Sequence, residues 1–228
     1  MRLAVALFMI VLPSRLRAEV GRRFFGWEID PTAYLGRSIV GVRHLSLGPG
    51  ASIGHLNVIW DLDELRLGEG SSISTRNWIT GDPPTSDLVE ASADRYSSLV
   101  MGCGSMITMG HNIDCSDRVS IGDHAGFVGF GCVVLTRQLD VAEDRAVTAP
   151  VELADRAVVM SGCTMLSGAR VPTRSIVSAG SVIATPLTEE LSLYRGNPAE
   201  AIRSLPANLR LWRRELPNAA AFAGDNGS

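Results

Sequence analysis

Two side chains suited to proton transfer lie close together in the middle of the chain, His111 and Asp114. A histidine can act as a general base because its ordinary pKa of about 6.5 lies near neutral pH. Asp114 follows three residues later and can orient the ring. A third candidate is Arg137, whose guanidinium stays protonated. Arg137 can therefore bind a phosphate or carboxylate through its planar fork, but it cannot act as a base.

A six-residue rhythm of apolar residues indicates which elements must position these groups. In the second half of the chain, large apolar residues recur at every sixth position: Leu153, Val159, Met165, Val171, Val177 and Ile183. Neither the 3.6-residue period of a helix nor the two-residue period of a strand produces this spacing. A hexapeptide repeat does, because each short strand forms one face of a coil and the coils stack. The sequence therefore predicts an all-β parallel β-helix.

The rhythm continues upstream with regular interruptions. Four further runs have the same spacing: Leu47, Ile53 and Ile59; Leu67, Ile73 and Ile79; Met101, Ile107, Ile113 and Val119; and Ile121, Phe127, Val133 and Leu139. Equivalent anchors recur twenty residues apart, as from Ile113 to Val133 and from Val133 to Leu153. This predicts three-sided coils in which the large residue points inward and small residues form the corners.

His111 and Arg137 both occupy the position of their hexapeptides that is normally small. Each is therefore expected to mark a corner and to lean out of the prism. The two corners differ by one face, or roughly 20 Å for a strand of six residues at about 3.3 Å each. We expect them to approach each other only across an interface between subunits. A structural alternative for His111 is a hydrogen bond to the next coil.

The chain divides into a cap over residues 1–30, the β-helix over 31–184 and a helical tail over 185–228. The apolar run Leu3–Leu12 is too short for a bilayer, which takes about twenty residues. We therefore expect an N-terminal helix, from Arg2 to about Phe25, to cover the first coil. Peripheral contact with the inner membrane is the alternative, through the basic residues Arg15, Arg17, Arg22 and Arg23.

Two other segments interrupt the repeat. Residues 82–98 are rich in Pro, Ser and acidic residues and are predicted to form one loop that projects from a corner. The tail is predicted to be helical over Ala199–Leu216, with one apolar side formed by Ile202, Leu205, Leu209 and Trp212.

Composition excludes several classes of protein. The 228 residues carry a net charge of −3 and are 46% hydrophobic, which suits one continuous core. No basic stripe is present, so we expect no nucleic-acid partner. The four cysteines lack the pair spacing of metal sites and are expected to be small buried thiols in a reducing cytoplasm: Cys103, Cys115, Cys132 and Cys163. No metal is predicted.

Short motifs in a fixed order resemble those of a known family. They include Leu12-Pro13-Ser14, Asn77-Trp78-Ile79, His111-Asn112-Ile113-Asp114, Ile121-Gly122-Asp123, Thr136-Arg137-Gln138-Leu139-Asp140, Ala149-Pro150-Val151 and Gly196-Asn197-Pro198-Ala199. Over roughly residues 12–205 the chain resembles the left-handed β-helix, or hexapeptide-repeat, acyltransferases. Within that family it is most similar to the colanic-acid-type sugar O-acetyltransferases. The expected fold is thus a left-handed parallel β-helix with an N-terminal helix, one extruding loop and a C-terminal helix.

The resemblance implies acetyl transfer from acetyl-CoA to a sugar or another small hydroxyl acceptor, in polysaccharide or secondary metabolism. Members are homotrimers with active sites between neighbouring prisms. On this basis Asn77 and Trp78 are candidate acceptor-binding residues, although capping of the core is the favoured role for Trp78. Candidates for binding CoA are Ser161, Gly162, Ala179, Gly180 and Arg195. The small residues among these can also be tight coil turns alone.

The chain departs from the family at the residue that usually acts as the base. The family motif is Thr-His-Ser-hydrophobic-Asp, and here Arg137 stands at the position of the histidine. Three alternatives follow. The first is that His111, with Asp114, serves as the base; a histidine supplied by a partner chain in a mixed trimer is a separate hypothesis. The chain can instead be a catalytically impaired binding or scaffold subunit, which the acidic Glu200 favours because a basic residue often follows Pro-Ala. Lastly, an acceptor such as an amine can activate itself, with Arg137 only positioning it.

Overall fold

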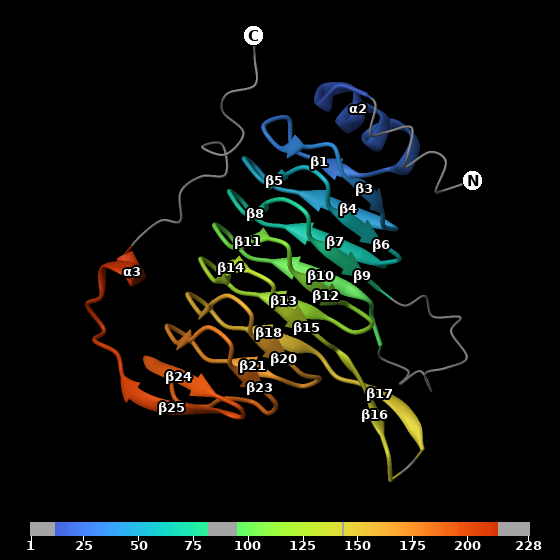
Figure 1. Cartoon of the computed structure of the whole chain (residues 1–228). Helices are drawn as coiled ribbons and strands as arrows, with labels where there is room; N and C mark the ends of the chain where they lie inside the picture. Colours follow the sequence, from blue (N-terminus) through green and yellow to red (C-terminus); the bar gives the residue numbers. More distant parts are fainter. Residues whose placement is uncertain (1–11, 82–94, 143, 214–228) are drawn as a thin grey trace.

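The computed structural model describes residues 12–81, 95–142 and 144–213, and short strands dominate them (Figure 1). Three sheets with parallel coil strands form the walls of a prism, so the predicted parallel β-helix is confirmed. Sheet A consists of β1 (Glu28–Ile29), β4 (His44–Leu47), β7 (Glu64–Leu67), β10 (Ser98–Met101), β13 (Val119–Ile121), β18 (Val151–Leu153) and β21 (Arg170–Val171). Successive strands of one sheet come from successive coils.

Sheets B and C complete each coil. Sheet B consists of β2 (Tyr34–Leu35), β5 (Ser52–Ile53), β8 (Ser72–Ile73), β11 (Met106–Met109), β14 (Gly126–Phe130), β19 (Val158–Val159), β22 (Ile176–Val177), β24 (Ser192–Gly196) and β25 (Ala199–Ser204). Sheet C consists of β3 (Ile39–Gly41), β6 (Val58–Trp60), β9 (Trp78–Thr80), β12 (Asn112–Asp114), β15 (Val133–Val134), β20 (Thr164–Met165) and β23 (Val182–Ile183).

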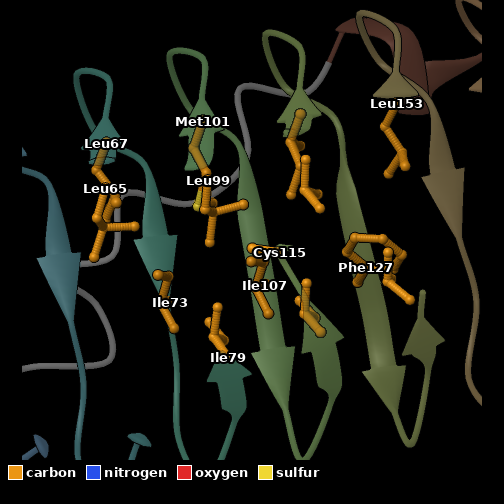
Figure 2. Close-up of a cluster of buried hydrophobic side chains, with 14 of the residues drawn as sticks. Leu65, Leu67, Ile73, Ile79, Leu99, Met101, Ile107, Cys115, Phe127 and Leu153 are labelled. Carbon is orange, nitrogen blue, oxygen red and sulfur yellow. The ribbon is translucent and has the colours of Figure 1, made fainter. Parts of the chain in front are cut away.

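The core is a stack of large apolar residues, mostly one from each strand of sheets B and C and two from most strands of sheet A. Residues from all three sheets point into the interior of the prism, as Figure 2 shows for Leu67, Ile79, Ile107 and Phe127 among others. All the predicted anchors except Val133 and Leu139 are 2% exposed or less. Full burial of such a side chain stabilises the fold by about 1.5–3 kcal/mol. The six-residue spacing therefore identified the core correctly over most of the chain.

The predictions for Val133 and Leu139 are wrong. The register between β11 and β14 shifts after Ile107, so the coil takes one extra residue, and Ile113 pairs with Val134. Val134 is consequently the buried residue, and Val133 points outward. Leu139 is 65% exposed because its segment leaves the prism as an antiparallel hairpin, β16 (Arg137–Asp140) with β17 (Arg145–Thr148).

The hairpin is a second insertion between coil strands, in addition to the predicted loop. It lengthens its coil, so the twenty-residue spacing does not hold there. Leu153 stacks on Ile121 rather than on the coil of Val133. Residues 82–94 of the predicted loop lie outside the described residues, and Ser98 already belongs to β10. The predicted loop and the hairpin both fall in the chain between a strand of sheet C and a strand of sheet A, after β9 and after β15 respectively. Figure 1 shows the hairpin projecting from the prism.

The N-terminal end of the prism is covered by α2 (Ser14–Phe25), which packs against β1 and β2. Ala18 is buried there, and a Cβ at Gly21 would lie 2.6 Å from the ring of Trp27. The part of the predicted helix before residue 12 lies outside the described residues. No helix in the described ranges is long and apolar enough to cross a membrane.

The predicted helix over Ala199–Leu216 is wrong in its first part. Ala199–Ser204 forms β25, which pairs antiparallel with β24, and β24 pairs with β22 at the end of sheet B. Strand pairing at the open sheet edge overrides the local helical pattern. Only α3 (Arg210–Arg213) is helical among the described tail residues, and Leu205 and Trp212 are nevertheless buried. Residues 214–216 lie outside the described residues.

The cysteines follow their prediction with one exception. Cys115, Cys132 and Cys163 are buried free thiols inside the coils. Cys103 is exposed at a corner, contrary to expectation. Among the described residues, no group of three or more His, Cys, Asp or Glu side chains is placed to hold a metal ion.

Candidate functional site

The corner between sheets B and C contains a ladder of buried polar side chains. Its members each precede a strand of sheet C, and we call them the corner ladder: Ser38, Asn57, Asn77, His111, Cys132, Cys163 and Ser181. The Nδ2 of Asn57 donates to Ser38 Oγ over 3.2 Å, and Asn77 Nδ2 donates to Asn57 Oδ1 over 3.0 Å. The backbone N–H of His111 then donates to Asn77 Oδ1 over 2.9 Å. The ladder joins one coil to the next.

His111 belongs to this ladder, so its predicted outward lean is wrong. The residue is only 1% exposed. The backbone N–H of Cys132 donates to Nδ1 over 3.1 Å, so Nε2 carries the ring proton. Nε2 lies 3.1 Å from Thr108 Oγ1, and that hydroxyl donates to the carbonyl of Gly129 over 2.7 Å. His111 therefore has the role given by the structural alternative, a hydrogen bond to the next coil.

Burial also makes His111 a poor proton acceptor. Desolvation lowers the pKa of His111 to about 4. The ring is therefore neutral near pH 7, and both nitrogens already have partners. A role as general base would require one of these hydrogen bonds to open.

Asp114 does not orient His111. Its Oδ1 accepts from the backbone N–H of Ser116 over 3.0 Å and from Ser116 Oγ over 2.6 Å. Thr136 Oγ1 lies 3.3 Å from Oδ2. His111 comes directly before β12, and Asp114 is the last residue of that strand. The two side chains therefore lie at opposite ends of β12.

The outer surface of sheet C is nearly free of charge. We call it the C face and define it by the outward residues of its strands: Ile39, Gly41, Val58, Trp60, Trp78, Thr80, Asn112, Asp114, Val133, Thr164 and Val182. Asp114 is the only ionisable residue in this set, and Trp78 is 56% exposed. The corresponding row on sheet A includes Glu28, Arg66, Glu152 and Arg170. Sequence reasoning did not recognise this contrast, although the alternating pattern of each hexapeptide contains it.

Beside the C face, the B–C corner exposes bare backbone. Four glycines precede ladder residues on successive coils and have positive φ values of 66°, 72°, 68° and 73°: Gly110, Gly131, Gly162 and Gly180. A Cβ on Gly110, Gly131 or Gly180 would meet nothing within 4 Å. We call these residues the glycine column. The predicted residues Ser161, Gly162, Ala179 and Gly180 all lie on it or directly before it, so the structure brings them together.

Large apolar side chains border the first two glycines. Met109 and Phe130 directly precede Gly110 and Gly131, and they are 51% and 67% exposed. The two residues are paired between β11 and β14. The backbone N–H of Phe130 donates to Ser161 Oγ over 3.2 Å. The glycine column thus has an apolar border on its sheet B side.

The remaining predicted residues are dispersed. Arg137 begins the hairpin at the C–A corner, next to the buried Thr136, whose Oγ1 lies 3.1 Å from the carbonyl oxygen of Asp114. Arg137 and His111 therefore lie at different corners, as predicted. Asn77 is buried in the corner ladder rather than exposed to an acceptor. Arg195 lies on β24, paired with Glu200, at the C-terminal end of sheet B.

Comparison with solved structures identifies the fold. The polysialic acid O-acetyltransferase OatWY is 13% identical to this chain, with a TM-score of 0.53 over 78% of this chain and 84% of OatWY. A point mutant of AntD, an N-acyltransferase from Bacillus cereus in complex with dTDP-4-amino-4,6-dideoxyglucose and coenzyme A, is 12% identical, with a TM-score of 0.54 over 83% and 89%. A hexapeptide transferase family protein from Anaplasma phagocytophilum is 21% identical, with a TM-score of 0.44 over 87% and 92%.

The chain has the left-handed β-helix fold of the hexapeptide-repeat transferases. No protein-family model matches it, and no curated protein matches its sequence. On this left-handed β-helix, the chemically useful groups gather at sheet C. They are a solitary carboxylate at one edge and the exposed backbone of the glycine column at the other.

None of the other histidines is an outward residue of a sheet C strand. His44 begins β4 of sheet A, and His124 follows Asp123 at the A–B corner. His55 contacts Tyr34 near the N-terminal end. The C face of this chain therefore offers Asp114, and no histidine, as a proton acceptor.

Proposed function

We propose that this protein is a CoA-dependent acyltransferase that transfers an acetyl group from acetyl-CoA to a hydroxyl or amine of a sugar or another small acceptor. The observation that carries the proposal is the glycine column beside the C face, with Asp114 on that face. Two neighbours with the same fold support it, because one is an O-acetyltransferase and the other an N-acyltransferase bound to coenzyme A. Polysaccharide or secondary metabolism and a cytoplasmic location are parts of the same proposal.

In this proposal the glycine column receives the donor. A pantetheine arm is slim and contains amides, so it can lie along exposed backbone that no side chain shields. On two earlier coils the equivalent positive-φ positions are Leu56 and Arg76, whose side chains would obstruct such an arm. Met109 and Phe130 offer apolar contacts along one side. The available column therefore extends from Gly110 to Gly180 and no further toward the N-terminus.

Asp114 takes the role of base in place of His111. The acceptor oxygen or nitrogen forms a bond to the acyl carbon while its proton passes to the carboxylate. The carbon–sulfur bond then breaks, and the proton returns to the departing CoA thiolate. A carboxylate is in general a weaker base than an imidazole. This suits an acceptor that needs little activation, such as an amine, and Arg137 would then position the acceptor's anionic group.

A homotrimer would complete the site. The C face presents Trp60, Trp78 and several β-branched residues, and a surface whose one ionisable outward residue is Asp114 favours contact between subunits. A second copy seated there would exclude water from Asp114 and bring a neighbour's corner close to it.

A binding or scaffold subunit is the second candidate function. The specific observation in its favour is that His111 is buried with both ring nitrogens occupied. Such a subunit would retain the glycine column, and with it the capacity to bind CoA.

Calorimetric titration with acetyl-CoA, combined with a thiol-release assay, tests the proposal. Gly131→Asn places a side chain on the glycine column with little backbone strain, because asparagine tolerates positive φ. Gly50→Asn makes the same change at the A–B corner, where φ is 63°. We expect Gly131→Asn to weaken acetyl-CoA binding about tenfold or more, and Gly50→Asn to leave it unchanged. Binding without thiol release in the presence of sugar hydroxyls and amines would favour the scaffold, whereas failure of the wild type to bind would refute both candidates.

A further inference from the structure

A buried arginine at the N-terminal end has one guanidinium nitrogen without a hydrogen-bond partner among the described residues. Arg17 of α2 is 3% exposed, and its Nε donates to the carbonyl of Leu12 over 2.9 Å. Within the described residues, its Nη1 is buried and has no hydrogen-bond partner. Leaving a charged donor without an acceptor in a buried place is costly. The position therefore suits an anion that the described residues do not supply.

Arg37 adds a second positive charge near Arg17. Burial, followed by the charges of Arg17 and Arg37, lowers the pKa of His55. Burial and the charge of Arg37 likewise lower the pKa of Arg17, while Tyr34 acts in the opposite direction. Residues 1–13 contain no Asp or Glu, so the segment before α2 cannot supply a carboxylate. Arg17, Arg37 and His55 lie close enough for their charges to interact.

A hydrogen-bond relay leaves Tyr34 as a donor. The backbone N–H of Arg37 donates to His55 Nδ1 over 3.0 Å, so the ring proton is on Nε2. Nε2 lies 3.1 Å from the Tyr34 hydroxyl and donates to its oxygen. The O–H of Tyr34 is then free to donate elsewhere. Where α2 packs against β2, Arg17 Nη1 and the Tyr34 hydroxyl therefore remain available as donors, and Arg37 lies near enough for its charge to act on Arg17.

We propose that Arg17, Tyr34 and Arg37 form a binding site for a phosphate group at the junction of α2 with the first coils. A phosphate offers only acceptor oxygens, and guanidinium groups match its geometry. A lipid headgroup is the favoured source, because α2 exposes Leu16 and Phe24 on its outer side, 51% and 73% exposed. Free phosphate would use the same donors. Figure 1 shows α2 at the N-terminal end of the prism, and this site is independent of the acyltransferase proposal.

Two binding measurements on the full chain test the site. The first is calorimetric titration with inorganic phosphate at constant ionic strength. The second is sedimentation with vesicles of phosphatidylcholine, either pure or mixed with phosphatidic acid. The variants are Arg17→Gln and Tyr34→Phe, and the matched control is Arg23→Gln, an exposed arginine in the last turn of the same helix. Tyr34→Phe removes one hydroxyl without changing charge, so it tests the site even if Arg17→Gln does not fold.

The site requires saturable phosphate binding by the wild type. Tyr34→Phe and Arg17→Gln should each weaken it about tenfold or more, and Arg23→Gln should not. Binding to vesicles with phosphatidic acid that the same two variants abolish would assign the lipid headgroup as the source. Binding of inorganic phosphate alone would assign free phosphate. Absence of both kinds of binding, or an equal loss in Arg23→Gln, would overturn the proposal.

Discussion

The backbone N–H of Cys132 donates a hydrogen bond to Nδ1 of His111 across neighbouring coils, over 3.1 Å. This bond fixes the neutral tautomer of the ring, because the other nitrogen must then donate to Thr108. A protonated Nδ1 could not accept the bond. The charge state of His111 is therefore linked to the contact between two coils of the prism.

Stability should consequently fall on acidification through a defined range. Burial lowers the pKa of His111 from an ordinary 6.5 to about 4 in the folded state. Below pH 6.5 His111 binds a proton in the unfolded chain but not in the folded chain. The free energy of unfolding therefore falls as the pH decreases toward 4. The total loss attributable to His111 is about 3 kcal/mol, and it levels off below pH 4. Urea unfolding at several pH values measures this slope.

His111→Asn should remove that slope while keeping the ladder. Asn57 already accepts a backbone N–H from the next coil through its Oδ1, so an asparagine at position 111 can do the same for Cys132. His111→Ala would leave that N–H unsatisfied and should cost about 1–3 kcal/mol at pH 7. His44→Gln, at an exposed position on β4, is the control and should keep the wild-type slope. An unchanged slope in His111→Asn would contradict the linkage.

The shifted register of β15 can be tested by two neighbouring substitutions. Val134 is fully buried, whereas Val133 points out of the prism. Val134→Ala should lower the free energy of unfolding by about 2–3 kcal/mol through lost burial and a cavity, and Val133→Ala by less than about 1 kcal/mol. Chemical denaturation of both variants decides between the two registers. A larger loss of stability in Val133→Ala than in Val134→Ala would support the original six-residue spacing.

Most of the core could be predicted because each coil repeats one local rule. Ile107 and Phe127 are inward since a large apolar residue at that spacing has only the interior of the prism to occupy. Nothing local distinguishes Val133 from Val134, because the added residue belongs to the irregular pairing of the preceding strand. The hairpin was missed for a similar reason, since Leu139 keeps the six-residue spacing although its segment leaves the prism.

The candidate site could be predicted only in part. The glycine column was accessible from sequence because small residues at equal positions indicate a corner. The burial of His111 was not, because its ladder partner Asn77 lies far away in sequence, beyond the intervening loop. A signal was present nonetheless: Asn57 and Asn77 occupy the equivalent position of their hexapeptides. A polar residue repeated at one corner indicates a ladder rather than an isolated catalytic group.

Asp114→Asn tests the proposed base. Asparagine retains an oxygen that can accept from Ser116, so the fold and the affinity for acetyl-CoA should be preserved. The rate of acyl transfer should fall by about 10²–10⁴-fold, because the proton acceptor is lost. Asp117→Asn, three residues further along the chain, is the matched control and should retain activity. Equal rates in Asp114→Asn and the wild type would exclude Asp114 as the base.

Trp78 tests the proposed assembly through the C face. Trp78 is 56% exposed on the C face, where Asp114 is the only ionisable outward residue, and burying Trp78 against a second copy would remove apolar area from water. We expect the wild type to have the mass of a trimer in light scattering and Trp78→Asp to dissociate, because a carboxylate would be desolvated at the contact. Phe24→Asp changes an aromatic residue of 73% exposure on α2, and it should leave the trimer intact. A monomeric wild type, or a trimeric Trp78→Asp variant, would show that the C face is not the subunit interface. In that case the position of Asp114 as the one ionisable outward residue of the C face would have to be explained within a single prism.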